Sequence, residues 1–431
     1  MNYKANTLWM LSERVSRLIF VFFINVLIAR YLGPDDFGIL NYAISLVGLL
    51  VPVSMLGFDV VLVKELVVHK RLNGILLYTA FSMMFVVSVV VVLFIWIFAG
   101  IFEKNNIAII IQVYSLTLLL NPAYVIDYFY QAKVMAKYSA IAYFLQSIFS
   151  ISFKLYLLSI DADLYWFAIA FFMDSVWLLI FLGCVFFIRK DIAGKKIGFN
   201  KTVAYVLLRR SLPLVFSGLM VIVYMRIDQV MLMWMVGESA VGAYAVAVRL
   251  SEAWYFVPIA ITASLFPMIL NHKNTQEKYL KSIQRLMDFL VYMSVSIAFI
   301  FLLFGAQIIH FIYGSEYEAS VAIIAVHAWT GVFVSLGLVS GKWLVAENLH
   351  SYTFYRTLSG AVINILLNYI LIVKFGVLGA AVATLVAQIF AAFIFDVFFT
   401  KTREMFVMKL TTLLFLSIIR DVVAYVKKYT W

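Results

Sequence analysis

An arginine and an aspartate stand two residues apart inside the apolar stretch VYMRIDQVMLMWMVG, Val223 to Gly237. A charge near the centre of a bilayer costs about 2.5–3.5 kcal/mol on insertion scales, so charged side chains there usually face water, a partner or a ligand. Arg226 lies about 15 Å from Gly237 along a helix, close to mid-span. Asp228 is rotated from it by about 200°, so the two cannot pair on one helix face. We predict that Arg226 lines a solvated path and that Asp228 meets another helix.

Further charged residues interrupt other apolar runs. Arg249 and Glu252 have i, i+3 spacing, so they either neutralise each other or contact a cargo. Arg14 and Arg17 share a helix face, where like charges repel unless an anion or Glu13 lies between them. Each pair therefore has a structural interpretation beside a cargo-binding one.

Three more charged residues have the same two interpretations. Lys154 and Asp174 lie deep in neighbouring apolar runs and either pair with each other or face a cavity. Asp59 lies near the end of its run, where a charged side chain reaches the membrane surface at low cost. Arginine supplies planar, bidentate donors suited to diphosphates and carboxylates. The candidate substrate-binding or cavity residues are thus Arg226, Asp228, Arg249, Arg14, Arg17, Lys154, Asp59 and Asp174.

Enzymatic chemistry has little support in this sequence. It has no Ser-His-Asp arrangement, no paired-carboxylate motif and no Walker A segment, so ATP is not the direct energy source. The five histidines lack metal-ligand spacing, and we interpret the deep His327 as a hydrogen-bonded packing residue. We expect no catalytic residue, no metal, no cofactor and no enzymatic activity.

The elements that hold these charges must be membrane helices. Of the 431 residues, 65% are hydrophobic and only 13% are charged, whereas a soluble surface requires about a quarter of the residues to be charged. A helix needs about 20 apolar residues to cross a bilayer. By that length we predict about twelve transmembrane helices, near residues 8–29, 38–66, 75–101, 107–131, 140–160, 164–188, 210–236, 241–270, 286–313, 319–346, 352–373 and 377–400.

The net charge of +11 is distributed unevenly over the connections. Every second connection is basic, the longest being Arg189 to Arg210, while the alternate ones have few cations. This is the positive-inside pattern, which predicts that both termini are cytoplasmic and removes any need for a nucleic-acid partner.

The twelve spans divide into two sets of six. We predict an N-terminal bundle over residues 1–188, a basic cytoplasmic linker over 189–209 and a C-terminal bundle over 210–400. Gly33, Gly38 and Ala43 match Gly237, Gly242 and Ala247 at one constant offset, which indicates parallel repeats related about the membrane normal. Such bundles commonly enclose a central cavity, as in a transporter. The tail, 401–431, has a short apolar run that is either an interfacial helix or a thirteenth span.

Several stretches carry a resemblance to a known family. They are SERVSRLIFVFFINVLIARYLGPDDFGILNYAISLV, LGFDVVLVKELV and YMRIDQVMLMWMVGESAVGAYAVAVRLSEAWYFVPIAITASLFPMI. In them the chain resembles the bacterial Wzx-type flippases of the multidrug/oligosaccharidyl-lipid/polysaccharide (MOP) superfamily. A further stretch, YFYQAKVMAKYS, matches only in part, with Ala132 and Val134 where glycine and an acid are expected.

The resemblance implies an all-α MOP/MATE-like fold and transport of undecaprenyl-diphosphate-linked oligosaccharide, such as O-antigen repeat units. Transport would run from the cytoplasmic to the periplasmic leaflet of the bacterial inner membrane. The implied partners are this glycolipid, membrane lipids and the polysaccharide polymerase with its chain-length machinery.

Two other classes of protein stay open. A multidrug or cation antiporter of the same superfamily should have mainly acidic residues in its first-half cavity, whereas arginine and lysine are at least as prominent here. A polymerase or ligase needs a large periplasmic loop, and the alternate connections are only a few residues long.

Overall fold

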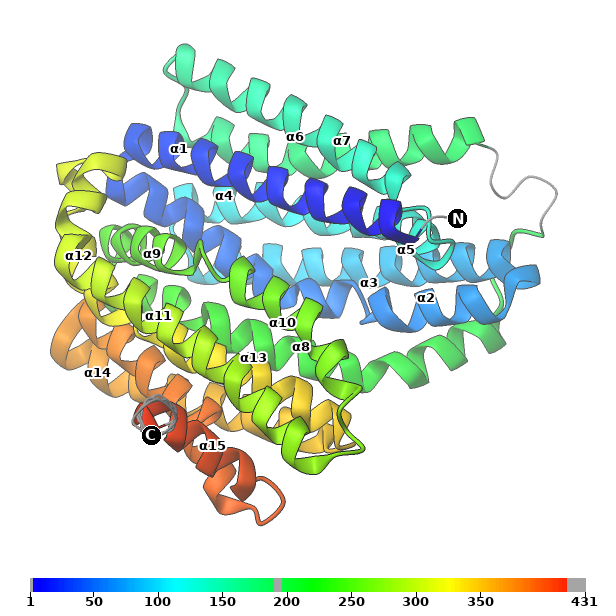
Figure 1. The fold of residues 1–431 in the computed structure, drawn as a ribbon. Coiled ribbons are helices and arrows are strands. Elements are labelled where there is room, and N and C mark those ends of the chain that lie inside the picture. The colour runs from blue at the N-terminus through cyan, green and yellow to red at the C-terminus, as the bar shows by residue number, and fades with distance from the viewer. Residues whose placement is uncertain (1–2, 190–195, 417–431) are drawn as a thin grey trace, which may run out of the picture. The chain divides into compact units, whose positions relative to one another are not determined.

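The structure is a computed structural model that describes residues 3–189 and 196–416 (Figure 1). Within these ranges the chain is almost entirely helical and has no β-strand. It separates into two compact units, Met1–Val230 and Met231–Trp431. We describe each unit by itself.

The first unit contains eight helices and two 3₁₀ turns within its described residues. They are α1 (Tyr3–Ser54), α2 (Phe58–Val68), η1 (Lys70–Leu72), α3 (Asn73–Phe102), α4 (Asn105–Ser115), η2 (Leu116–Ala123), α5 (Tyr124–Ala132), α6 (Ala136–Ser159), α7 (Leu164–Arg189) and most of α8 (Lys201–Met235). Helix α6 packs along both α7 and α1. Helices α2 and α5 pack together around Leu62 and Phe129.

The second unit contains the end of α8 and the remaining described helices. They are α9 (Glu238–Glu252), α10 (Phe256–Leu270), α11 (Gln276–Tyr313), η3 (Ser315–Tyr317), α12 (Ala319–His327), α13 (Thr330–Ala346), α14 (His350–Ala392), η4 (Ile394–Phe398) and α15 (Arg403–Leu413). Helix α11 packs on α13, and α12 packs on α9.

Membrane-crossing helices account for nearly all of the described chain. Among the described residues, ten segments are long and apolar enough to cross a bilayer, and two of them, Ser16–Val68 and His350–Phe398, have 53 and 49 residues. A single crossing takes about 20 residues, and each long segment is interrupted by a non-helical glycine, Gly33 or Gly376. Counting both halves of each interrupted segment gives the twelve spans that the sequence predicts. The polytopic all-α fold is therefore confirmed.

The matched glycines of the sequence repeat have the same type of backbone conformation. Gly33 has φ 70° and ψ 176°, and Gly237 has φ 123° and ψ −173°. This region of φ/ψ space is almost restricted to glycine because a Cβ atom clashes with the backbone there. Ten residues further along, Ala43 and Ala247 are both fully buried. The two hairpins thus share a local geometry, while superposition of whole bundles stays a prediction.

The boundary between the compact units lies within α8, after Val230. Leu207, near the start of α8, belongs to the same apolar core as Leu62 of α2. The predicted bundles, 1–188 and 210–400, and the linker 189–209 remain a proposal. Residues 190–195 of that linker lie outside the described residues.

The described part of the C-terminal tail is docked through buried polar groups. Lys409 of α15 donates hydrogen bonds to the Ala392 carbonyl at 2.6 Å and to Asp396 Oδ2 at 2.5 Å. Burial lowers the pKa of Lys409 to about 8, and Asp396 acts in the opposite direction. Nearby, Thr412 donates to Asp288 Oδ1 at 2.6 Å. The rest of the tail, 417–431, lies outside the described residues, and with it the choice between an interfacial helix and a thirteenth span.

Candidate functional site

Arg226 and Asp228 have different environments on α8. Asp228 is 3% exposed, whereas Arg226 is half-buried. The next residue, Gln229, is also buried and accepts a hydrogen bond from Ser45 Oγ of α1 at 2.8 Å. Within the first unit, α8 therefore turns the Gln229 side chain toward α1. The difference in burial between Arg226 and Asp228 follows from the rotation between their positions.

Lys154 and Asp174 form an ion pair between α6 and α7, which pack side by side (Figure 1). Lys154 Nζ lies 2.5 Å from Asp174 Oδ2 and also donates to Ser150 Oγ at 3.0 Å. The ammonium lies 4.1 Å from the ring centroid of Phe171. The Lys154 side chain is only 3% exposed and that of Asp174 is 23% exposed. The sequence left open whether the two residues pair or face a cavity, and the structure shows that they pair.

Tyr114 of α4 lies within electrostatic range of both Asp174 and Arg226. The Tyr114 ring also lies beside Phe171, with centroids 6.5 Å apart. We call Lys154, Asp174 and Arg226 the embedded charge cluster. Its members come from α6, α7 and α8.

The embedded charge cluster has two cations and one carboxylate. Within the described residues, the Arg226 guanidinium makes no ion pair and no hydrogen bond. Guanidinium groups bind oxyanions through planar, paired N–H donors. The cluster can therefore accept an anionic group without a further counterion.

Arg17 belongs to a second polar group, on α1, α5 and α6. Its Nε lies 3.0 Å from Glu13, and its guanidinium lies 4.8 Å from the ring centroid of Tyr143. Tyr143 donates to Asp127 Oδ2 at 3.3 Å, and Gln131 donates to the same oxygen at 2.9 Å. Arg17 thus pairs with Glu13, which was one of the two compensating groups, a bound anion being the other, that the sequence analysis left open.

These side chains line a cavity of about 130 Å³. Asp127, which is 8% exposed, is a residue that sequence reasoning missed. Its signal was an acid four residues before Gln131 within an apolar run. The side chain of Arg14 lies outside the described part of the chain.

Two predicted site residues do not join the embedded charge cluster. Asp59 lies exposed in the first turn of α2, electrostatically coupled to Tyr128. Arg249 is half-buried on α9 in the second unit, within electrostatic range of the Tyr313 phenol. Glu252, at the end of the same helix, lies within electrostatic range of the Tyr255 phenol.

The second unit contains a buried network of uncharged polar groups that sequence reasoning also missed. Asn368 donates to Asn364 Oδ1 at 3.1 Å, and Asn364 donates to Thr384 Oγ1 at 3.3 Å. Tyr244 of α9 lies 3.2 Å from the same threonine hydroxyl. Asn364 and Asn368 are fully buried. The network joins α9 to both halves of the interrupted helix α14.

His327 has the packing role predicted from the sequence. It is 3% exposed, and its Nδ1 lies 2.7 Å from Ser251 Oγ. Across the described ranges, no group of three or more histidine, cysteine, aspartate or glutamate side chains is placed to hold a metal ion.

Comparison with solved structures defines the class of fold. A multidrug resistance MATE family transporter of the MOP superfamily, in an inward-facing conformation, matches with a TM-score of 0.70 and 14% identity, over 91% of this chain and 96% of that one. The lipid II flippase MurJ, in an inward closed conformation, matches with a TM-score of 0.70 and 16% identity, over 96% of this chain and 93% of that one. The chain has the polytopic all-α fold of the MOP superfamily.

The chain belongs to the polysaccharide biosynthesis protein family, whose model matches residues 3–273. The MatE family model matches residues 213–370. Two proteins of Haloferax volcanii are similar over part of the sequence. The probable low-salt glycan biosynthesis flippase Agl15 is 29% identical over 149 residues, 34% of this chain and 32% of its own length. The probable flippase AglR is 31% identical over 177 residues, 38% of this chain and 36% of its own length. The matches thus span about a third of these relatives.

Proposed function

We propose that this protein is a flippase that moves a lipid-linked oligosaccharide across the membrane. The family model, the glycan flippases among its relatives and the MOP-type fold support this proposal. Transport of this kind needs no covalent chemistry, so we propose that the protein is not an enzyme.

The observation that carries the proposal is the half-buried Arg226, which lies within electrostatic range of Tyr114, as does Asp174 of the Lys154–Asp174 pair. A cation at this depth costs a few kcal/mol on insertion scales, and a carboxylate partner normally offsets that cost. Asp174, whose charge acts on the same tyrosine as that of Arg226, is already paired with Lys154. An anionic cargo group would compensate the guanidinium during transport. The phosphate-containing linkage between carrier lipid and glycan is such a group.

The finer form of the proposal comes from the sequence resemblance. It specifies undecaprenyl diphosphate as the carrier, an O-antigen or related repeat unit as the glycan, and movement from the cytoplasmic to the periplasmic leaflet. From the same resemblance we propose a bacterial inner membrane as the location and a polysaccharide polymerase as a partner. The distribution of basic residues over the connections supports cytoplasmic termini. The curated relatives are archaeal glycan flippases, which support the glycan cargo at the coarser level.

An antiporter of small cations is the alternative, and the MatE match over residues 213–370 favours it. An antiporter site should present uncompensated carboxylates inside the membrane. The embedded charge cluster instead has more cations than carboxylates. The charge balance of this cluster therefore favours an anionic cargo, while the buried Asp127 beside Arg17 is the carboxylate that an antiporter would use.

Deletion of the gene from the producing organism tests the proposal. Lipid-linked oligosaccharide should accumulate in the membrane while surface polysaccharide falls, and mass spectrometry of the accumulated lipid would identify carrier and repeat unit. Complementation with Arg226→Ala should leave export defective at normal protein abundance, because loss of an uncompensated cation relieves an insertion cost. Normal surface polysaccharide in the deletion strain would exclude this function.

A further inference from the structure

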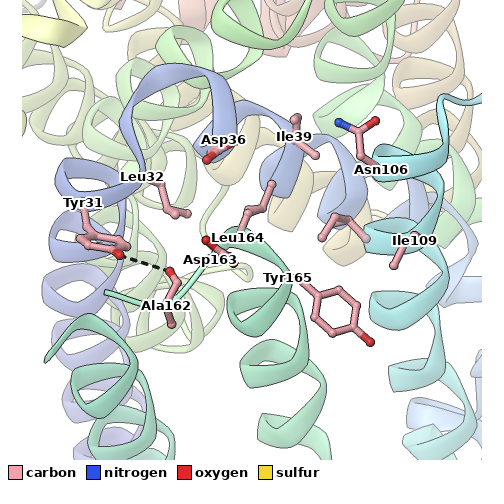
Figure 2. Close-up of a pocket in the computed structure, with 11 residues that line it drawn as sticks. Tyr31, Leu32, Asp36, Ile39, Asn106, Ile109, Ala162, Asp163, Leu164 and Tyr165 are labelled. Atoms are coloured by element: carbon pink, nitrogen blue, oxygen red, sulfur yellow. Dashed lines mark hydrogen bonds between the residues drawn. The ribbon is translucent and has the colours of Figure 1, made fainter. Parts of the chain in front are cut away.

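An open pocket lies where three hairpin ends of the first unit meet (Figure 2). Its volume is about 830 Å³, within the range of about 300–1,000 Å³ that is usual for small-molecule sites. The walls come from the two halves of α1, from the start of α4 and from the hairpin between α6 and α7. Its described lining includes no member of the embedded charge cluster.

One hydrogen bond ties two walls of the pocket together. Tyr31 donates from its hydroxyl to the Ala162 carbonyl at 3.2 Å, as the dashed line in Figure 2 shows. This bond joins the end of the first α1 segment to the α6–α7 hairpin. The pocket is therefore held by a contact that is independent of any ligand.

The pocket lining combines flat apolar surface with uncharged and acidic polar groups. Ile39 and Ile110 are buried, and Tyr165 supplies an exposed aromatic ring. Asn106 contributes an amide, and Asp36 and Asp163 contribute carboxyl groups. Sugars have apolar C–H faces that pack on aromatic rings, and hydroxyls that bond to carboxyl and amide groups. The lining has the composition of a saccharide site.

The charge of the pocket lining suits the glycan part of a lipid-linked cargo and not its phosphate part. Among the described residues, no lysine or arginine lines the pocket, so a diphosphate would meet two carboxyl groups and no cation. Burial, Asp35 and Asp163 raise the pKa of Asp36, which lies in the hairpin between two spans. Carboxylate oxygens accept hydrogen bonds from neutral hydroxyls whatever their neighbours. Phospholipid headgroups also contain a phosphate and are disfavoured for the same reason as the diphosphate.

The pocket also lies at the end of the unit where a glycan would leave. Its hairpins, residues 30–38, 103–106 and 160–164, belong to the connections with few cations. The charge rule assigns those connections to the extracytoplasmic side. A cargo whose phosphate binds at mid-membrane would present its sugars toward this end after translocation.

We propose that this pocket is an exit subsite that binds the oligosaccharide part of the lipid-linked cargo through neutral sugar residues. The assignment rests on the proposed function. It adds a second contact point for the cargo, chemically distinct from the anion-binding embedded charge cluster.

Photocrosslinking in native membranes tests the subsite. A benzophenone amino acid replaces Ile109, which lines the pocket, or Ile97 of α3, which is 63% exposed and does not line it. After irradiation, the purified protein is probed for glycan by periodate-hydrazide labelling and for lipid by mass spectrometry. We expect glycan on the Ile109 variant alone. Phospholipid at both positions without glycan, or no adduct at Ile109, would overturn the subsite.

Matched substitutions measure the contribution of the lining. Tyr165→Ala should lower the glycan crosslink at position 109 by about three- to tenfold, as expected for loss of one aromatic contact. Trp166→Ala removes a neighbouring exposed ring outside the pocket and should leave the yield unchanged. Asp163→Asn should reduce the yield more than Asp161→Asn, a change in the same hairpin outside the lining. Equal yields within both pairs would contradict the assignment.

The deletion strain separates this inference from the proposed function. If deletion leaves surface glycan normal, the flippase proposal itself fails. If deletion abolishes surface glycan while each lining variant exports and crosslinks as well as its matched control, only the exit subsite fails.

Discussion

Lys154 Nζ and Asp174 Oδ2 lie 2.5 Å apart between two membrane-spanning helices of the first unit. The lysine is nearly inaccessible, while the aspartate keeps 23% of its side-chain surface exposed. Because each charge compensates the other, the pair as a whole has no net charge with which to balance Arg226. This pairing gives the embedded charge cluster its excess of cations.

Breaking the pair from either side should have unequal costs. Asp174→Asn strands the buried Lys154 ammonium and should lower stability by about 3–5 kcal/mol. Lys154→Met should cost less, because Asp174 retains access to solvent. The double variant should recover much of the loss. Thermal unfolding in detergent would rank the variants, and a double variant less stable than both singles would contradict the pairing.

An exposed ion pair provides the control for that series. Lys273 and Glu347 are 3.1 Å apart and are 43% and 30% exposed. Such pairs contribute about 0–1 kcal/mol, so Lys273→Met should change the melting temperature little.

The hairpin glycine of the second unit should not tolerate a side chain. Gly237→Ala places a Cβ at φ 123°, so backbone strain of about 1–3 kcal/mol is expected. Among the described residues, no neighbouring atom lies within 4 Å of the position that this Cβ would occupy, so crowding does not add to that cost. Gly183→Ala, in helix α7 with equally open surroundings, should be neutral or slightly stabilising. Equal melting temperatures for the two variants would remove the strain argument.

The buried Lys409–Asp396 pair should hold α15 on the second unit. Lys409→Met strands a carboxylate that is 2% exposed and should speed proteolysis of the C-terminal tail. Arg403→Met, an exposed position on the same helix, is the matched control. Limited proteolysis in detergent followed by mass spectrometry gives the rates. Unchanged cleavage in Lys409→Met would show that the pair does not anchor the helix.

Membrane orientation can be measured with single cysteines. Cys184 is the only cysteine of the chain and is first replaced by serine. A cysteine at Ser315, in the α11–α12 hairpin, should react with an impermeant maleimide in intact cells, whereas one at Thr275 should react only after permeabilisation. The opposite labelling would invert the orientation inferred from the charge distribution.

Helix positions were predictable from the sequence because a crossing needs only an apolar run of sufficient length. The hairpins at Gly33 and Gly237 were predictable for a related reason, since their backbone conformation is almost restricted to glycine. Which side chains pair between helices was harder to predict from the sequence. Lys154 and Asp174 were both selected as charges, but their contact depends on how α6 packs on α7.

The residues that sequence reasoning missed were missed for different physical reasons. Charge at mid-span was the criterion for a candidate, so Asn364 and Asn368 were passed over because they are uncharged. Asp127 is an acid within an apolar run, but the family pattern expects its acid seven residues later, at Val134. Lys409 was seen as an interruption of an apolar run, but its partner Asp396 is brought close only by the turn before α15.

The most direct test of the central claim is flipping by purified protein in liposomes. Lipid-linked oligosaccharide isolated from the deletion strain is reconstituted with wild type, Arg226→Ala or Arg226→Lys, and its exposure to an added lectin is followed with time. Wild type should translocate the lipid faster than protein-free liposomes, and alanine should fall to the protein-free rate. Lysine should be intermediate, because it keeps the charge without the planar donors. Translocation by Arg226→Ala at the wild-type rate would contradict the claim that this arginine binds the anionic cargo.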